Sequence, residues 1–216
     1  MIKYLWLFCL IPTLLYGAAG DVASVSGKAV TAISTVSGVA GASIATLCGK
    51  SYSDGDATCT TEAQSCTTSN NVADNGMGTY LWKASKFAAS GDMTVCKIEV
   101  NLKKVGTPTH NITVHIYGST GTEPNEADII DSSDTVSAST LTTSYAYITF
   151  TGLSAELTSG TEYWLVIQNA AGDGSNYVAG QVDTGCDYEE GTLYSSNGTT
   201  WGHSDYDRGF KYRLYE

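Results

Sequence analysis

Apolar and polar residues alternate in short segments along most of the chain from residue 80 onward. Turns such as GSTGTEPNE, LTSGT and SSNG separate these segments. Strands of about five to nine residues with a period of two, broken by such turns, are typical of all-β domains. The segments are VCKIEVNLKKV (95–105), NITVHIYGS (111–119), YAYITFTGL (145–153), EYWLVIQNA (162–170) and GFKYRLYE (209–216). The pattern therefore predicts an antiparallel all-β sandwich or barrel over 80–216.

The first of these segments shows which side chains should face the core. Every second position is apolar, at Cys96, Ile98, Val100 and Leu102. Alternate side chains of a strand point to the same face of the sheet. We therefore expect Cys96 to face the core, within reach of Cys186.

The first twenty residues, MIKYLWLFCLIPTLLYGAAG, have the pattern of a secretory signal peptide. Lys3 precedes an apolar run from Leu5 to Leu15, and the small residues from Gly17 to Ala19 follow it. Signal peptidase accepts small residues at that place, and the apolar run is short for a transmembrane helix. The sequence predicts a signal peptide over 1–19 and a secreted, extracellular protein. The alternative is an uncleaved N-terminal anchor.

A repeat segment follows over 20–50. VSGKAVTAIST (25–35) is followed by VSGVAGASIAT (36–46) and LCGK (47–50), which gives a period of 11 residues. Such a period can produce a helical supercoil, but the glycine and β-branched residues of each repeat disfavour a helix. Short strands separated by glycine turns are expected instead. Because so few repeats cannot bury their own apolar side, the segment is either a stalk that self-associates through 21–50 or a flexible linker.

Residues 51–79 are polar, and we interpret them as loop structure held by cysteines. Cys9 would leave with the signal peptide, and the other cysteines are disulfide candidates because exported proteins meet an oxidising environment. These candidates are Cys48, Cys59, Cys66, Cys96 and Cys186. Their number is odd, so one stays free or pairs between chains. Cys59 and Cys66 would close a small loop, but the spacing leaves the connectivity open.

The composition excludes several functional classes. The chain has 216 residues and a formal net charge of -11, with 11 basic and 22 acidic side chains. A protein that binds nucleic acid through a basic surface needs clustered Lys and Arg, so no nucleic-acid partner is expected. No apolar run after residue 17 is long enough for a transmembrane helix. The acidic excess is typical of an exported β-protein that must stay soluble and avoid pairing of its sheet edges.

Four stretches together resemble a known jelly-roll family, the β-sandwich module of secreted bacterial "choice-of-anchor" proteins and of phage tail and appendage proteins. They are FAASGDMTVCKIEVNLKKVGTPTHNITVHIYG (87–118), SASTLTTSYAYITFTG (137–152), LTSGTEYWLVIQNAAGDGSNYVAG (157–180) and LYSSNGTTWGHSDYDRGFKYRLY (193–215). The resemblance implies a jelly-roll sandwich similar to carbohydrate-binding modules. It also implies attachment to a ligand or surface, but it carries over no particular binding residue. The signal-like start and the extra cysteines depart from a typical phage copy.

The segment LYSSNGTTWG is a candidate binding hairpin. Asn197-Gly198 is a strong two-residue turn motif, and counting outward from it places Tyr194 opposite Trp201. Two rings on one face would form a platform on which a sugar can stack. The alternative is a cross-strand aromatic pair that only stabilises the hairpin.

Three further tyrosines are candidate ligand-binding residues because they lie in polar, loop-like segments beside aspartates. They are Tyr177, Tyr188 and Tyr206. Exposed aromatic rings among acidic and amide groups are usual both for sugar sites and for the rims of sandwiches. Trp164 differs, because it lies in the continuous apolar run YWLVI and is expected in the core.

Two acidic segments offer oxygen ligands for calcium. The run Asp54 to Asp56 resembles the start of a calcium loop, but the acidic residue that should close the loop is missing. The other segment, EADIIDSSDTV, carries Asp128, Asp131 and Asp134. A solvated acidic loop is the alternative for both. We expect no cofactor, with calcium as the candidate if there is one.

The sequence predicts a protein that is not an enzyme. It lacks the G-x-S-x-G, H-E-x-x-H and P-loop motifs. Glu189 and Glu190 are adjacent, so on a strand they would point to opposite faces rather than act together. We expect an exported binding or adhesion module that recognises glycans or a cell surface. The alternative is a structural subunit of an extracellular fibre or appendage, including a phage tail adhesin, assembled through the N-terminal repeats.

Overall fold

The computed structural model describes residues 59–70, 72–186, 191–205 and 207–216, together with four short strands nearer the N-terminus. The chain divides into two units, Met1–Thr58 and Cys59–Glu216. In the described ranges the structure is all-β, with two 3-10 turns, η3 (Ala138–Thr140) and η4 (Thr184–Cys186), and no α-helix. Among the same residues, no helix has the length and hydropathy needed to span a membrane.

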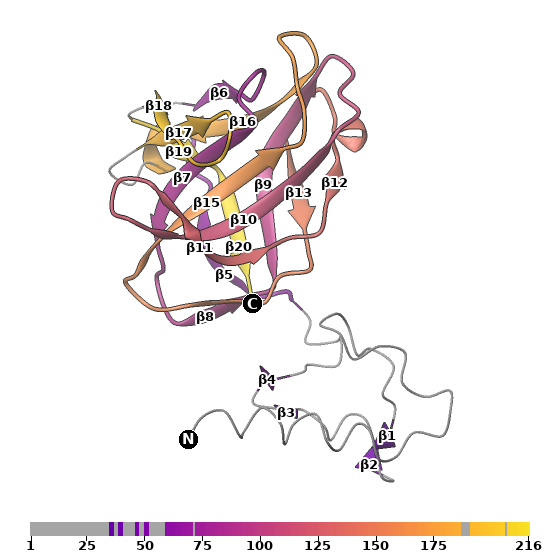
Figure 1. The fold of residues 1–216 in the computed structure, drawn as a ribbon, viewed down its shortest axis with the longest axis vertical. Coiled ribbons are helices and arrows are strands. Elements are labelled where there is room, and N and C mark those ends of the chain that lie inside the picture. The colour runs from indigo at the N-terminus through magenta and orange to yellow at the C-terminus, as the bar shows by residue number, and fades with distance from the viewer. Residues whose placement is uncertain are drawn as a thin grey trace. The chain divides into compact units, whose positions relative to one another are not determined.

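The second unit is an antiparallel β-sandwich, as the alternating pattern predicted. The first sheet has the order β11, β10, β15, β7, β17, β18, with β12 paired to β10. Its strands are β7 (Trp82–Ala88), β10 (Asn111–Ser119), β11 (Pro124–Ser132), β12 (Val136–Ser137), β15 (Glu162–Asn169), β17 (Thr192–Ser195) and β18 (Gly202–Asp205). In Figure 1, β10 and β15 cross over β9 of the other sheet.

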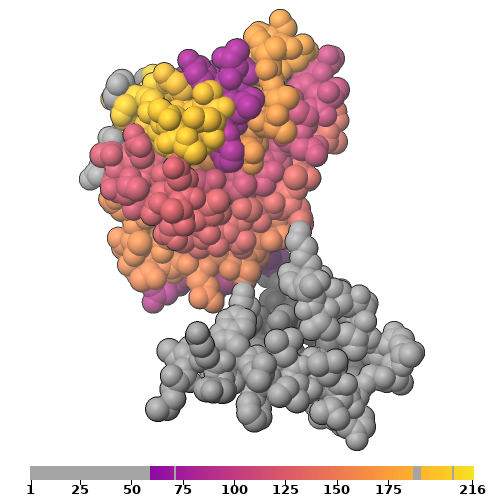
Figure 2. All heavy atoms as spheres, viewed as in Figure 1, coloured from indigo at the N-terminus to yellow at the C-terminus, as the bar shows by residue number. Residues whose placement is uncertain are grey.

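The second sheet is built around β9, which pairs with β13, β16 and β20. Beyond them, β6 and β19 pair with β16, and β5 pairs with β20. These strands are β5 (Glu62–Cys66), β6 (Val72–Gly76), β9 (Lys97–Val105), β13 (Ala146–Phe150), β16 (Tyr177–Asp183), β19 (Gly209–Phe210) and β20 (Tyr212–Tyr215). Two short strands, β8 (Met93–Val95) and β14 (Ala155–Leu157), pair with each other. In Figure 2 the residues around β6 (purple) border the C-terminal residues (yellow) on one side of the sandwich.

Two strands lie where the sequence predicted only loop. β5 and β6 fall within 51–79, and both pair in the second sheet. Their sequences, EAQSC and VADNG, lack the alternation of the other strands. Pairing with β20 and β16 therefore outweighs a weak local preference for strand.

The core lies between the inner faces of the two sheets. Ile98, Val100 and Leu102 are fully buried, as the alternation along β9 predicted. From the first sheet, Leu165 and Ile167 of β15 pack into the same core. Alternate side chains of a strand point to opposite faces, so every second residue of each sheet lies outside this core.

A second apolar cluster lies on the outer face of the first sheet. It consists of Ala84, Tyr117, Trp164, Val166 and Leu193, with Trp82 and Trp201 packed against it. Trp164 is fully buried, as predicted, although in this cluster rather than between the sheets. Its indole N–H donates a hydrogen bond to Ser119 Oγ at 3.1 Å, which satisfies the buried donor.

Two disulfides, Cys59–Cys96 and Cys66–Cys186, hold β5 at both ends. The suggested pairs Cys59–Cys66 and Cys96–Cys186 are therefore wrong. Cys59 precedes β5 and Cys66 is its last residue, so the extended strand between them keeps them apart. The described residues contain no free cysteine, and Cys48 lies outside them.

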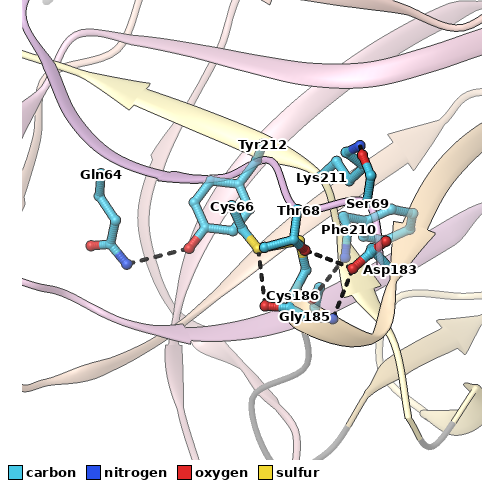
Figure 3. The surroundings of a disulfide bond; sticks show 11 residues. Gln64, Cys66, Thr68, Ser69, Asp183, Gly185, Cys186, Phe210, Lys211 and Tyr212 are labelled. Atoms are coloured by element: carbon cyan, nitrogen blue, oxygen red, sulfur yellow. Dashed lines mark hydrogen bonds between the residues drawn. A yellow bond between two sulfur atoms is a disulfide. The ribbon is translucent and has the colours of Figure 1, made fainter. Parts of the chain in front are cut away.

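The surroundings of Cys66–Cys186 are polar and tightly hydrogen-bonded (Figure 3). Asp183, at the end of β16, is fully buried. Its carboxylate accepts a hydrogen bond from Thr68 Oγ1 at 2.6 Å and one from the backbone N–H of Gly185 at 2.8 Å. These bonds fix the η4 turn that carries Cys186.

The N-terminal unit contains two described hairpins. β1 (Thr35–Val36) pairs with β2 (Val39–Ala40), and β3 (Thr46–Leu47) pairs with β4 (Lys50–Ser51). Equivalent strands of the two hairpins are 11 residues apart, the spacing of the sequence repeat. Whether the segment is a stalk or a linker stays a prediction, and the predicted signal peptide lies outside the described residues.

Candidate functional site

Four tyrosines lie on the outer face of the second sheet. Tyr177 of β16 is one of the predicted ligand-binding residues, whereas Tyr145, Tyr147 and Tyr215 were not predicted to have a role. All four are half-buried. The register of the strands shows that the tyrosine side chains point outward. The neighbours of Tyr147 and Tyr215 in the chain, Ile148 and Leu214, pair with the core residues Val100 and Ile98. Tyr147 and Tyr215 pair instead with Asn101 and Lys97, on the opposite face. We call this surface the tyrosine face.

Each of three rings on the tyrosine face has a cation beside it. The Nζ of Lys103 is 4.5 Å from the ring centroid of Tyr145, and that of Lys97 is 3.6 Å from the centroid of Tyr215. The guanidinium of Arg213 is 4.0 Å from the centroid of Tyr147. A cation over an aromatic face is attracted by the ring quadrupole, by about 0.5–1 kcal/mol at exposed sites. These contacts favour the observed positions of the rings.

Carboxylates complete the polar surroundings of the rings. Asp74 of β6 forms an ion pair with Lys103 and accepts a hydrogen bond from the Tyr145 hydroxyl at 2.8 Å. The hydrogen bond from Lys103, followed by that from Tyr145, lowers the pKa of Asp74. Burial, and next the bond to Asp74, raises the pKa of Tyr145. At neutral pH the pair is therefore a phenol donating to a carboxylate.

Glu99 plays the same part at the other end of the face. It accepts a hydrogen bond from the Tyr215 hydroxyl at 2.9 Å and pairs with Arg213 at 3.3 Å. Arg213 also lies 3.7 Å from Glu62. The tyrosine face thus presents fixed aromatic rings, hydroxyls and charges of both signs side by side.

Small residues leave room for the Tyr177 ring to lie flat against the sheet. A Cβ atom added to Gly76 would lie 2.9 Å from the Tyr177 ring, so the ring covers this glycine. The next outward residue of β16 is Ala179, which pairs with both Gly76 and Lys103. A side chain at Gly76 would therefore require the Tyr177 ring to move.

Tyr194 lies on a different surface. Tyr194 pairs with Lys83 of β7, and Lys83 pairs on its other side with the core residue Ile167 of β15. Tyr194 therefore faces into the space between the sheets, at their edge. Its ring packs on that of Tyr80 with 4.1 Å between centroids. Lys83 Nζ lies 5.4 Å from the Tyr194 centroid and 5.6 Å from that of Tyr80.

The predicted pairing of Tyr194 with Trp201 is wrong. Tyr194 lies opposite Gly202, and Trp201 packs against the cluster on the outer face of the first sheet. The two-residue turn does not form, because Asn197 closes a wider loop. Its Oδ1 accepts hydrogen bonds from the backbone N–H groups of Thr199 and Thr200, each at 3.0 Å. The two rings therefore do not form a shared platform.

The structure does not bring together the described members of the predicted ligand-binding set. Tyr177, Tyr194 and Trp201 lie on three separate surfaces, and Tyr188 and Tyr206 lie outside the described residues. Tyr145 and Tyr147 were detectable in principle, since two tyrosines at a spacing of two share one face of a strand. Their meeting with Tyr215 depends on β9 lying between β13 and β20, which local sequence does not encode.

The candidate calcium ligands do not gather into a site. The Asp128 carboxylate lies against Gly118, and that of Asp134 against Gly152. Asp131 accepts hydrogen bonds from the backbone N–H groups of Ser132 and Ser154. Over the described ranges no three His, Cys, Asp or Glu residues are grouped as metal ligands. The run from Asp54 to Asp56 lies outside those ranges, as do Glu189 and Glu190.

Comparison with known proteins gives no family. The sequence matches no protein-family model and no curated protein.

Proposed function

We propose that this chain is an exported, non-catalytic module that binds glycans or a cell surface through the tyrosine face. The observation that carries the proposal is the set of Tyr145, Tyr147, Tyr177 and Tyr215, half-exposed on one outer sheet face. Sugars combine apolar C–H faces with many hydroxyls. Flat rings beside fixed donors and acceptors match both properties.

The proposal includes a jelly-roll topology for the sandwich, in line with the resemblance to choice-of-anchor and phage tail modules. It also includes export, which the disulfides favour because such bonds persist mainly in oxidising compartments. The net charge of -11 would repel acidic polymers. The expected ligand is therefore a neutral glycan.

A glycan array probed with the full-length protein, followed by titration calorimetry on the best neutral ligand, tests this function. Tyr145→Ala and Tyr177→Ala should each weaken binding about tenfold or more, as expected for loss of a ring that carries binding energy. Tyr80→Ala is the matched control, because Tyr80 is 39% exposed but lies at the sheet edge with Tyr194. Folded protein that binds no neutral glycan, or equal loss in the control, would reject the proposal.

A second candidate function rests on the N-terminal hairpins. Two hairpins at an 11-residue spacing suit a stalk that assembles copies of the chain, with the sandwich as a displayed head. The protein would then be a structural subunit of a fibre or appendage, including a phage tail adhesin. Light scattering of the full chain and of a variant lacking 21–50, with and without reductant, tests this. A monomer in every condition excludes it.

A further inference from the structure

Lys83 is a buried amine at the edge where the two sheets meet. The residue is only 3% exposed, although lysine is rarely buried without a charged partner. In the described part of the chain its side chain donates to a hydroxyl, Ser204 Oγ at 2.7 Å, rather than to a carboxylate. The rings of Tyr80 and Tyr194 cover it.

The Ser204 hydroxyl joins Lys83 to a buried carboxamide. It accepts the hydrogen bond from Lys83 and donates one to Asn75 Oδ1 at 3.1 Å. The Nδ2 of Asn75 in turn donates to Thr192 Oγ1 at 2.7 Å. Asn75 is 6% exposed and Thr192 fully buried. An amine and a carboxamide thus lie one hydroxyl apart, and Lys83 belongs to β7 of the first sheet while Asn75 belongs to β6 of the second.

The state of the amine suits attack on a carbonyl carbon. Burial lowers the pKa of Lys83 to about 8, so a fraction of the side chain is the neutral nucleophile near neutral pH. The hydrogen bond from Ser204 to Oδ1 polarises the Asn75 carbonyl, as a donor does in an oxyanion hole. The Thr192 hydroxyl lies next to the nitrogen that would leave.

We propose that Lys83 and Asn75 form an intramolecular amide bond that joins β7 to β6. The lone pair of Lys83 Nζ attacks Asn75 Cγ, and a new C–N bond forms. The Cγ–Nδ2 bond then breaks and Nδ2 leaves as ammonia, which takes up the proton that Nζ gives up. Ser204 Oγ contacts Nζ, which loses this proton, and Thr192 Oγ1 contacts Nδ2, which gains it. No oxidant, metal or other reactant is needed.

The bond would remove a buried cation and connect the two sheets covalently. An unpaired buried charge is costly, whereas an amide needs only hydrogen-bond partners, which Ser204 and Thr192 supply. Lys83 and Asn75 would thus be covalently modified residues of the interior, and neither belongs to the proposed ligand-binding surface. This inference does not depend on the tyrosine face.

Mass spectrometry of the purified full-length protein tests the proposal. We expect the reduced protein to weigh about 17 Da less than its sequence, the mass of ammonia. The sequence from 51 to 82 contains no Lys or Arg, so a tryptic digest should contain residues 51–86 as one peptide. This peptide should be closed into a loop between residues 75 and 83, lighter by the mass of ammonia, and uncut after Lys83. Lys83→Arg and Asn75→Ala should each restore the mass calculated for their own sequence.

The decisive result comes from the wild-type protein and so does not depend on how well a variant folds. If folded wild-type protein has its full calculated mass and trypsin cleaves after Lys83, the proposal is wrong. A positioning role for Ser204 predicts that Ser204→Ala forms the bond more slowly over days of incubation. A loss of mass that persists in Asn75→Ala would place the modification elsewhere and also overturn the proposal.

Discussion

Tyr212 and Phe87 meet across the sandwich, with 5.6 Å between their ring centroids. Tyr212 comes from β20 of the second sheet and Phe87 from β7 of the first. The Tyr212 residue is 5% exposed, and its hydroxyl lies 3.3 Å from Gln64 Nε2. The ring therefore ties the edge strand β5, which carries Gln64, to the centre of the core.

This burial makes stability depend on pH in alkaline solution. Burial raises the pKa of Tyr212 to about 12, partly opposed by the hydrogen bond from Gln64. Between about pH 10 and 12 the unfolded chain has lost the phenolic proton and the folded chain has kept it, so stability falls as pH rises. Urea titrations should show wild type losing about 2 kcal/mol more over this window than Tyr212→Phe. Parallel profiles for the two proteins would contradict this.

The two disulfides should contribute unequally to stability. Cys66–Cys186 closes a loop of 120 residues and Cys59–Cys96 one of 37. On the chain-entropy estimate these loops correspond to about 5 and about 4 kcal/mol. We expect the Cys66→Ser, Cys186→Ser double variant to unfold at lower urea than the Cys59→Ser, Cys96→Ser variant. The reverse order would mean that native-state contacts around the bonds outweigh loop entropy.

Gly209 is expected to tolerate no side chain. A Cβ atom there would overlap the backbone carbonyl of Cys186 and lie 2.9 Å from Ser85 Oγ. Because backbone cannot move aside cheaply, Gly209→Ala should destabilise the protein by about 3 kcal/mol. Gly91→Ala is the matched control, since a Cβ there meets nothing within 4 Å, and it should change stability by less than about 1 kcal/mol. Chemical denaturation of both variants gives the comparison.

The loop after β17 depends on one side chain. Asn197 Oδ1 accepts hydrogen bonds from two backbone N–H groups and from Ser195 Oγ. Asn197→Ala should cost about 1 kcal/mol, whereas Asn197→Asp keeps the acceptor and most of the stability. Gly198 of this loop lies against the Trp82 ring. Tryptophan fluorescence should therefore shift in Asn197→Ala and stay close to wild type in Asn197→Asp.

Local pattern predicted the sandwich and its core but not which strands meet. The burial of Ile98, Val100 and Leu102 could be predicted from the sequence, because period-two alternation is a local property. The disulfide partners were not, because Cys66 and Cys186 meet only after β5 and β16 have joined the same sheet.

The candidate site shows the same division. The register of the hairpin failed because the side chain of Asn197, rather than the Asn-Gly backbone, sets the width of the loop. Tyr145, just before β13, and Tyr215 of β20 lie on opposite sides of β9, so no local pattern groups them. Tyr177 was identified from its polar neighbours in the sequence. They indicate correctly that it is exposed, but not which residues surround it in the fold.

The double attachment of β5 also has a mechanical consequence. Cys59 is the first residue of the sandwich unit, and its bond to Cys96 leads to the start of the central strand β9. Tension applied along the N-terminal segment would therefore enter the sandwich through a covalent bond rather than through the hydrogen bonds of an edge strand. Peeling of the edge strand β5, the easiest way to pull a sheet apart, is therefore blocked while the two disulfides are intact.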